Sequence, residues 1–280
     1  MTMGRLVWSE IVKTFLKKRT YLGFLIVLLV IPIVEWAFKV EGGRFLRAAT
    51  RNLAADFLVL GNLFNGWFVS YQVMNVLWIH VPLLITFVAG DMLAGEATAG
   101  TYRLILIRPV SRTRILVAKY MTTVLYVVLF VAFLGVVSVG LAIVLLGTGD
   151  LLIFSRGILV LPEADVAWRF ILAYILAVAP MMTIASIAFF TSSFVENAIG
   201  PIVATMGIVI VLTIITVLPV EAFNTSRTYL FTYHLIVWQK AFLDPIPWSE
   251  IVLSLTNLAV YSCAAVTGTW FVFTRKDILS

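Results

Sequence analysis

Long neutral segments separated by short charged ones dominate the pattern of this chain. A helix needs roughly 20 apolar residues to cross the hydrocarbon core of a membrane, and several of the neutral runs reach that length. A shorter run lies near the start, where Glu35 would sit at the membrane interface beside Trp36. The pattern therefore predicts one all-α integral membrane domain over residues 1–280, with six transmembrane helices at about residues 21–38, 71–90, 120–146, 170–192, 199–218 and 251–273.

Two segments outside these spans also have helical patterns. Residues 3–19 place apolar side chains on one face and lysines on the other, which predicts an interfacial helix on the inner membrane surface. The alternative is a basic flank that only orients the first span. Residues 219–250 are rich in Tyr and Trp, which settle at the membrane–water boundary. We expect short outer-leaflet helices there that end near Pro245 and Pro247.

Composition supports the membrane assignment. Hydrophobic residues make up 62% of the chain and charged residues 12%, with a mean hydropathy of +1.06, whereas soluble domains carry about 25% charge. The net charge of +6 comes from 20 Lys and Arg against 14 Asp and Glu. Because Lys and Arg concentrate in cytoplasmic loops, we interpret the excess as an insertion signal and not as nucleic-acid binding.

The distribution of Lys and Arg also predicts orientation. By our count, the side that would hold both termini and the connection between the second and third spans carries most of them. We therefore expect a multi-pass protein of the plasma (inner) membrane of a prokaryote, with both termini in the cytoplasm.

Several kinds of chemistry are absent from the sequence. It contains no G-x-x-x-x-G-K-S/T phosphate loop, no His and Cys cluster with metal-ligand spacing, and no nucleophile motif beside His80 or His234. We expect the predicted spans to hold no buried charged residue of the kind that ion-coupled transporters use. We expect a protein that is not an enzyme, holds no cofactor or metal, and receives its energy from an associated protein.

The segment between the second and third spans carries the most specific pattern. It resembles the cytoplasmic signature of type-2 ATP-binding-cassette (ABC-2 type) exporter permeases at Glu96, Gly100, Thr101, Leu104, Ile105, Pro109, Ser111, Arg112, Ile115, Leu116 and Lys119. In local terms, Pro109 would end one helix and Ser111 would cap the next. Lys119 would then lie at the lipid headgroups. The alternative is an ordinary basic inner loop.

The resemblance implies a function and a set of partners. A cytoplasmic coupling helix would contact a separate ABC ATPase that holds ATP and Mg. Two permease copies and two ATPases would assemble among the membrane lipids to export an amphipathic or lipid-like substrate. The implied contact residues are Asp91, Glu96, Gly100, Thr101, Arg103, Pro109 and Arg112.

The same resemblance implies a substrate pathway at the interface between permease copies, lined by the second and fifth spans. The candidates there are Asn75, Trp78, Pro82, Thr86, Thr205, Thr213 and Thr216. A Thr in a span more often bonds to its own helix or to a neighbour than to a substrate. The main alternative function is a mechanotransmission module that drives a periplasmic partner without moving a substrate; a membrane enzyme is disfavoured.

Overall fold

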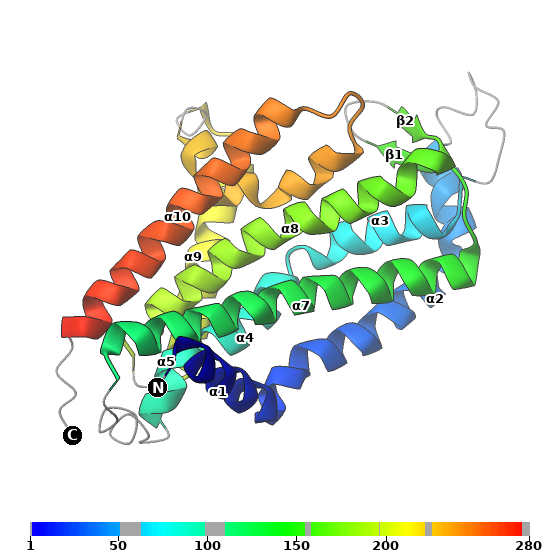
Figure 1. Cartoon of the computed structure of the whole chain (residues 1–280). Helices are drawn as coiled ribbons and strands as arrows, with labels where there is room; N and C mark the ends of the chain where they lie inside the picture. The colour runs from blue at the N-terminus through cyan, green and yellow to red at the C-terminus, as the bar shows by residue number, and fades with distance from the viewer. Residues whose placement is uncertain are drawn as a thin grey trace.

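The computed structural model describes residues 2–50, 63–98, 110–154, 158–195, 197–221 and 226–275, without the side chains of residues 45–50. Long helices run side by side between two ends of the molecule (Figure 1). One end holds α1 (Met3–Leu16), α5 (Asp91–Thr98) and the start of α7 (Arg112–Leu146), and is named here the terminal end. The other holds the antiparallel pair β1 (Leu151–Phe154) and β2 (Ile158–Leu161), and is named the hairpin end.

The helices confirm a helical membrane protein. Within the described ranges, five segments are long and apolar enough to cross a bilayer. They lie in α2 (Leu22–Thr50), α7, α8 (Glu163–Thr191), α9 (Ile199–Val217) and α10 (Trp248–Arg275). A further pair, α3 (Gly66–Leu77) and α4 (Val81–Ala89), meets the same criterion jointly and would count as a sixth span if it crosses as one unit.

The break between α3 and α4 corrects the continuous helix expected over residues 71–90. The two helices are bent by 55°. Pro82 stands in the first turn of α4, where its missing N–H costs nothing. Continuing α3 through this point would instead remove the bond to the Trp78 carbonyl and press the proline ring against it. The chain therefore turns at residues 78–80 and restarts.

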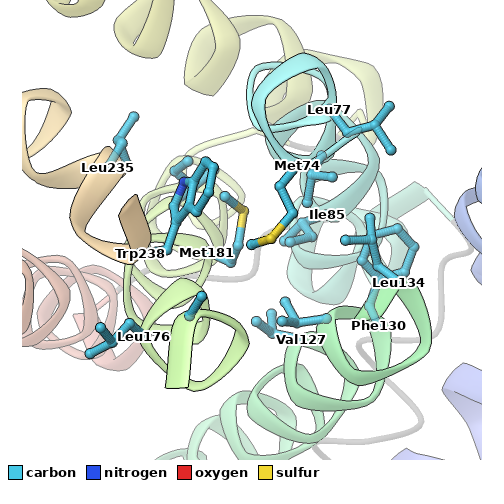
Figure 2. Close-up of a cluster of buried hydrophobic side chains, with 14 of the residues drawn as sticks. Met74, Leu77, Ile85, Val127, Phe130, Leu134, Leu176, Met181, Leu235 and Trp238 are labelled. Atoms are coloured by element: carbon cyan, nitrogen blue, oxygen red, sulfur yellow. The ribbon is translucent and has the colours of Figure 1, made fainter. Parts of the chain in front are cut away.

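Helix α8 is the centre of the bundle. It packs against α4, α7, α9, α10 and η4 (Phe231–Phe242), and 61% of its most apolar window is buried, against 17% for α9 and for α10. Figure 2 shows Met74 of α3, Met181 of α8 and Trp238 of η4 converging in this core. These three side chains line an apolar cavity of about 40 Å³ beside the break in the second span.

The connections differ from expectation at the hairpin end. The polar sequence pattern of residues 147–169 favours a loop, but before α8 the chain forms β1 and β2, whose Leu151, Leu152 and Ile153 are buried. Between α9 and α10, η3 (Arg227–Tyr229) and η4 occupy the segment where short helices were predicted. η4 is also more buried than a surface helix, since Phe231 and Phe242 are at most 1% exposed.

Helix α1 is amphipathic as predicted, but its polar side faces the protein. Trp8 and Leu16 are 67% and 77% exposed, which suits a helix whose apolar side meets lipid. Glu10 and Thr14 are buried against the bundle. The polar face thus supplies contacts within the chain, which the periodicity alone did not indicate.

Glu35 corrects the expectation that it lies at the interface and that the spans hold no buried charged residue. Its side chain is fully buried within α2, and neither carboxyl oxygen has a hydrogen-bond partner among the described residues. The spans therefore do hold a buried ionisable group, and the expectation of an external energy source loses this support.

Candidate functional site

A cluster of ion pairs joins α1 to α5 at the terminal end. The cluster also reaches α7, because Lys119 of α7 pairs with Glu10 of α1. We name it the ionic cluster, and it comprises Glu10, Lys13, Lys17, Arg19, Asp91, Glu96 and Lys119.

On the α5 side, each carboxylate meets cations from the first twenty residues of the chain. Lys17 Nζ donates to Asp91 Oδ2 at 2.9 Å, and Arg19 of η1 (Lys18–Tyr21) pairs with the other oxygen of Asp91. Lys13 pairs with Glu96. These cations are partly exposed, whereas the carboxylates are 6% and 2% exposed, so α1 covers the acidic face of α5.

Lys119 is the buried centre of the cluster. Its side chain is 1% exposed, and its Nζ donates to Glu10 Oε2 at 2.8 Å and to Glu96 Oε1 at 2.9 Å. A buried ammonium is tolerated only when it is paired and hydrogen-bonded. One side chain of α7 thereby fixes α1 and α5 together.

The first turn of α5 is held by Ser192, the residue directly after α8. Its hydroxyl accepts from the backbone N–H groups of Leu93 at 3.2 Å and Ala94 at 2.8 Å, and donates to the Gly90 carbonyl at 2.6 Å. The first N–H groups of a helix have no partner within it. The hydroxyl of Ser192, which lies far from α5 in the sequence, supplies that partner. Gly90 alone separates α4 from α5. Helix α5 is therefore linked to α1, α4, α7 and α8.

The residues expected to contact an ATPase divide into three groups. Asp91 and Glu96 lie in the ionic cluster and face into the chain. Arg112, at the start of α7, donates to the Thr274 carbonyl of α10 at 3.2 Å. Those remaining lie outside the described residues, namely Gly100, Thr101, Arg103 and Pro109.

Two local expectations for this segment have opposite outcomes. Ser111 caps α7 as predicted, since its hydroxyl accepts from the Arg114 N–H at 3.4 Å. The placement of Lys119 at the lipid headgroups is wrong, because its ammonium is buried in the ionic cluster. A capping residue acts over three positions, whereas the partners of Lys119 lie on other helices.

The pathway candidates of the second span lie around its break. Asn75 lines a large cavity at the hairpin end, and its Oδ1 accepts from Gln239 Nε2 of η4 at 2.8 Å. Trp78 lines the small apolar cavity at the core. Pro82 and Thr86 are buried, and the Thr86 hydroxyl donates within its own helix at 2.7 Å. The structure does not bring these four to one surface.

The pathway candidates of the fifth span bond mainly within the protein. The Thr205 hydroxyl lies 2.9 Å from that of Thr191 on α8. The Thr216 hydroxyl lies 2.7 Å from that of Thr232 on η4. Thr213 is partly exposed on α9. Their role in a pathway remains a prediction.

The cavity at the hairpin end has a volume of about 910 Å³ and lies between α3, the two strands, η4 and the start of α10. His234 lies in its wall, and burial lowers the pKa of this imidazole. Its Nε2 donates to the Thr228 carbonyl at 2.9 Å, and Nδ1 lies 3.0 Å from Ser254 Oγ. Sequence reasoning missed this cavity because its walls come from four separate segments.

Within the described part of the chain, no group of three or more His, Cys, Asp or Glu side chains is arranged to hold a metal ion.

Comparison with known proteins places the chain in a family. The profile of the family described as "Protein of unknown function (DUF2705)" matches residues 51–279. The chain belongs to the DUF2705 family. It is also similar to "Uncharacterized protein YhcI" of Bacillus subtilis (strain 168), with 25% identity over 205 residues, which cover 70% of this chain and 64% of YhcI. In this DUF2705 member, the matched region contains α5 and most of the transmembrane helices, while α1 precedes it.

Proposed function

We propose that this chain is the membrane permease subunit of an ATP-driven exporter, with the ATPase on a separate polypeptide. It would pair with a second permease copy in a prokaryotic plasma membrane, with both termini in the cytoplasm. ATP and Mg would bind to the ATPase subunits. The substrate would be amphipathic or lipid-like. The proposal combines the helical membrane fold with the resemblance carried by the segment from Asp91 to Lys119.

The observation that carries the proposal is the way α5 is held. A short helix in an ordinary loop needs few contacts, but α5 is bound by ion pairs through its side chains and by Ser192 through the backbone of its first turn. Lys119 connects it to α7, which runs 35 residues toward the hairpin end. A displacement of α5 would therefore displace α4, α7 and α8 together. This is the mechanical property that a coupling helix requires.

The outward faces of the bundle suit lipid or a second copy. Helix α9 is apolar and little buried, and it exposes Val203, Ile210, Val211 and Ile214. Large contiguous apolar surfaces mark contact with membrane or protein. The surface of α9 is consistent with the dimer interface that the resemblance implies.

The first experiment concerns the energy source. The chain has no phosphate loop, so we expect the purified chain neither to bind nor to hydrolyse ATP. In vesicles that also contain the partner ATPase, ATP should drive substrate movement, and replacing the partner's phosphate-loop lysine should stop it without dissociating the complex. Transport driven by a proton or sodium gradient in ATP-free vesicles would refute the proposal. ATP hydrolysis without any transport would favour the mechanotransmission module.

The second experiment tests the link through α5. Lys17→Ala removes one of the two cations that pair with Asp91, whereas Lys18→Ala removes an exposed neighbour. We expect Lys17→Ala to lower the amount transported per ATP hydrolysed, with assembly retained, and Lys18→Ala to match the wild type. Equal ratios in the two variants would exclude the α1–α5 contact from coupling.

A further inference from the structure

The 910 Å³ cavity at the hairpin end has the size of a small-molecule site, since such sites enclose roughly 300–1,000 Å³. It is separate from the ionic cluster, which lies at the opposite end of the bundle (Figure 1). Its character can be determined from the groups that line it.

One part of the wall is apolar. The strands contribute Leu152, Ile153 and Leu159, and the rings of Tyr71 and Tyr233 come from α3 and η4. Such a wall would accept a hydrocarbon segment, and the face of a tyrosine ring also attracts a cation. The apolar wall therefore favours an amphipathic occupant.

In the part of the chain that the structure describes, two cations at or beside the cavity already have partners. Lys240 Nζ pairs with Glu250 Oε2 at 3.1 Å, and it also donates to the Glu250 carbonyl and to Ser254 Oγ, each at 3.3 Å. These three contacts use all three hydrogens of the ammonium. Arg169 is 5% exposed, donates to the Leu243 carbonyl at 2.7 Å and pairs with Asp244 Oδ1 at 3.2 Å. Neither cation is positioned to bind an anionic ligand.

The two carboxylates of the lining, in contrast, are exposed and only partly paired. The side chains of Asp244 and Glu250 are 60% and 62% exposed. Each pairs with its cation through one oxygen, and within the described residues the second oxygen has no hydrogen bond or ion pair. Within the described residues, the lining thus offers two carboxylates that each have one oxygen without a partner, while the Lys240 ammonium is held in an ion pair.

We infer that this cavity binds an amphiphile with an ammonium head group. The ammonium hydrogens are donated to the free oxygens of Asp244 and Glu250, and the hydrocarbon lies along the strand wall. Charge-assisted hydrogen bonds of this type are stronger than neutral ones. All of the lining residues that the structure describes come from this one chain.

The test uses the purified full-length chain in a neutral maltoside detergent, with equilibrium dialysis against micelles that contain no protein. Three probes with one chain length and different head groups are compared: octylammonium, octyl sulfate and octanol. We expect saturable binding of one octylammonium per chain. The other two probes should bind more weakly by on the order of tenfold.

Three variants locate the site. Glu250→Gln removes an acceptor and releases Lys240, so octylammonium binding should fall by on the order of tenfold while octyl sulfate binding rises. Glu163→Gln changes an exposed carboxylate at the same end that does not line the cavity, and it should bind as the wild type does. Leu159→Trp adds bulk to the strand wall and should weaken all three probes.

Each opposite result overturns the inference. Equal binding of the three probes, a preference for octyl sulfate in the wild type, or unchanged octylammonium binding in Glu250→Gln would each do so. Because no ATP or ATPase is present, these results are independent of the exporter proposal. Size-exclusion elution and the melting temperature of each variant verify that its fold is intact.

Discussion

Replacing Lys119 by Met gives the sharpest test of the ionic cluster. The substitution keeps the length of the side chain and removes its charge. It leaves the Glu10 and Glu96 carboxylates without the ammonium 2.8 and 2.9 Å away. Glu96 keeps its pair with Lys13, but no other ion pair with Glu10 is present in the described part of the chain.

The magnitude follows from burial. The side chains of Lys119, Glu96 and Glu10 are 1%, 2% and 10% exposed, so water cannot replace the lost partner. Removing one member of a buried ion pair costs about 3–5 kcal/mol. For a chain of this size, about 1 kcal/mol shifts the melting temperature by roughly 2–4 °C, so we expect a decrease on the order of 10 °C.

The measurement is thermal unfolding of purified variants in one detergent, followed by circular dichroism. Arg114→Met is the matched control, because Arg114 is an exposed cation on the same helix. Its effect should stay within about 0.5 kcal/mol. If Lys119→Met lowers the melting temperature no more than Arg114→Met does, the buried ion pairs of Lys119 do not stabilise the protein.

A rescue experiment separates uncompensated charge from lost packing. Combining Lys119→Met with Glu10→Gln and Glu96→Gln makes the centre of the cluster neutral at nearly constant volume. Neutral replacements of buried ion pairs are often tolerated. We expect the triple variant to be more stable than Lys119→Met alone. A further loss of stability would instead indicate that packing by the lysine stem dominates.

Three further predictions concern the other structural features. Ser192→Ala removes the acceptor for two α5 N–H groups and should cost about 1–2 kcal/mol with faster hydrogen exchange in α5, whereas Ser193→Ala should leave that exchange unchanged. Gly66→Ala would place a Cβ 2.7 Å from the Ala142 backbone and should destabilise the α3–α7 contact by about 1–3 kcal/mol, whereas at Gly140 the space is open and alanine should be neutral or stabilising in thermal unfolding. A cysteine at Thr113, introduced without the native thiol, should react with a membrane-impermeant reagent only from the cytoplasmic side; labelling from outside would reverse the proposed orientation.

The sequence alone determined the features that depend on local pattern. Long apolar runs located the transmembrane helices, because each must satisfy its own backbone inside a bilayer. Ser111 was identified as a cap, since capping acts over three positions. The polar and apolar faces of α1 followed from helical periodicity.

The tertiary structure decided what those faces contact. Lys119 belongs to a long helix, and its partners come from residues 10 and 96, so no local signal distinguished a buried ion pair from a headgroup contact. The hairpin-end cavity is likewise assembled from α3, the strands, η4 and α10. Pairings between distant segments appear in the sequence only as isolated polar residues.

The prolines show the same division. Pro32 and Pro180 lie inside unbroken helices, whereas the second span is interrupted at Pro82. A proline removes one helical hydrogen bond in each case. Within a membrane bundle, neighbouring helices determine whether the freed carbonyl can be accommodated or whether the chain turns and restarts. The prolines in the sequence determined where a helix could break. The packing around α3 and α4 determined that the break occurs at Pro82.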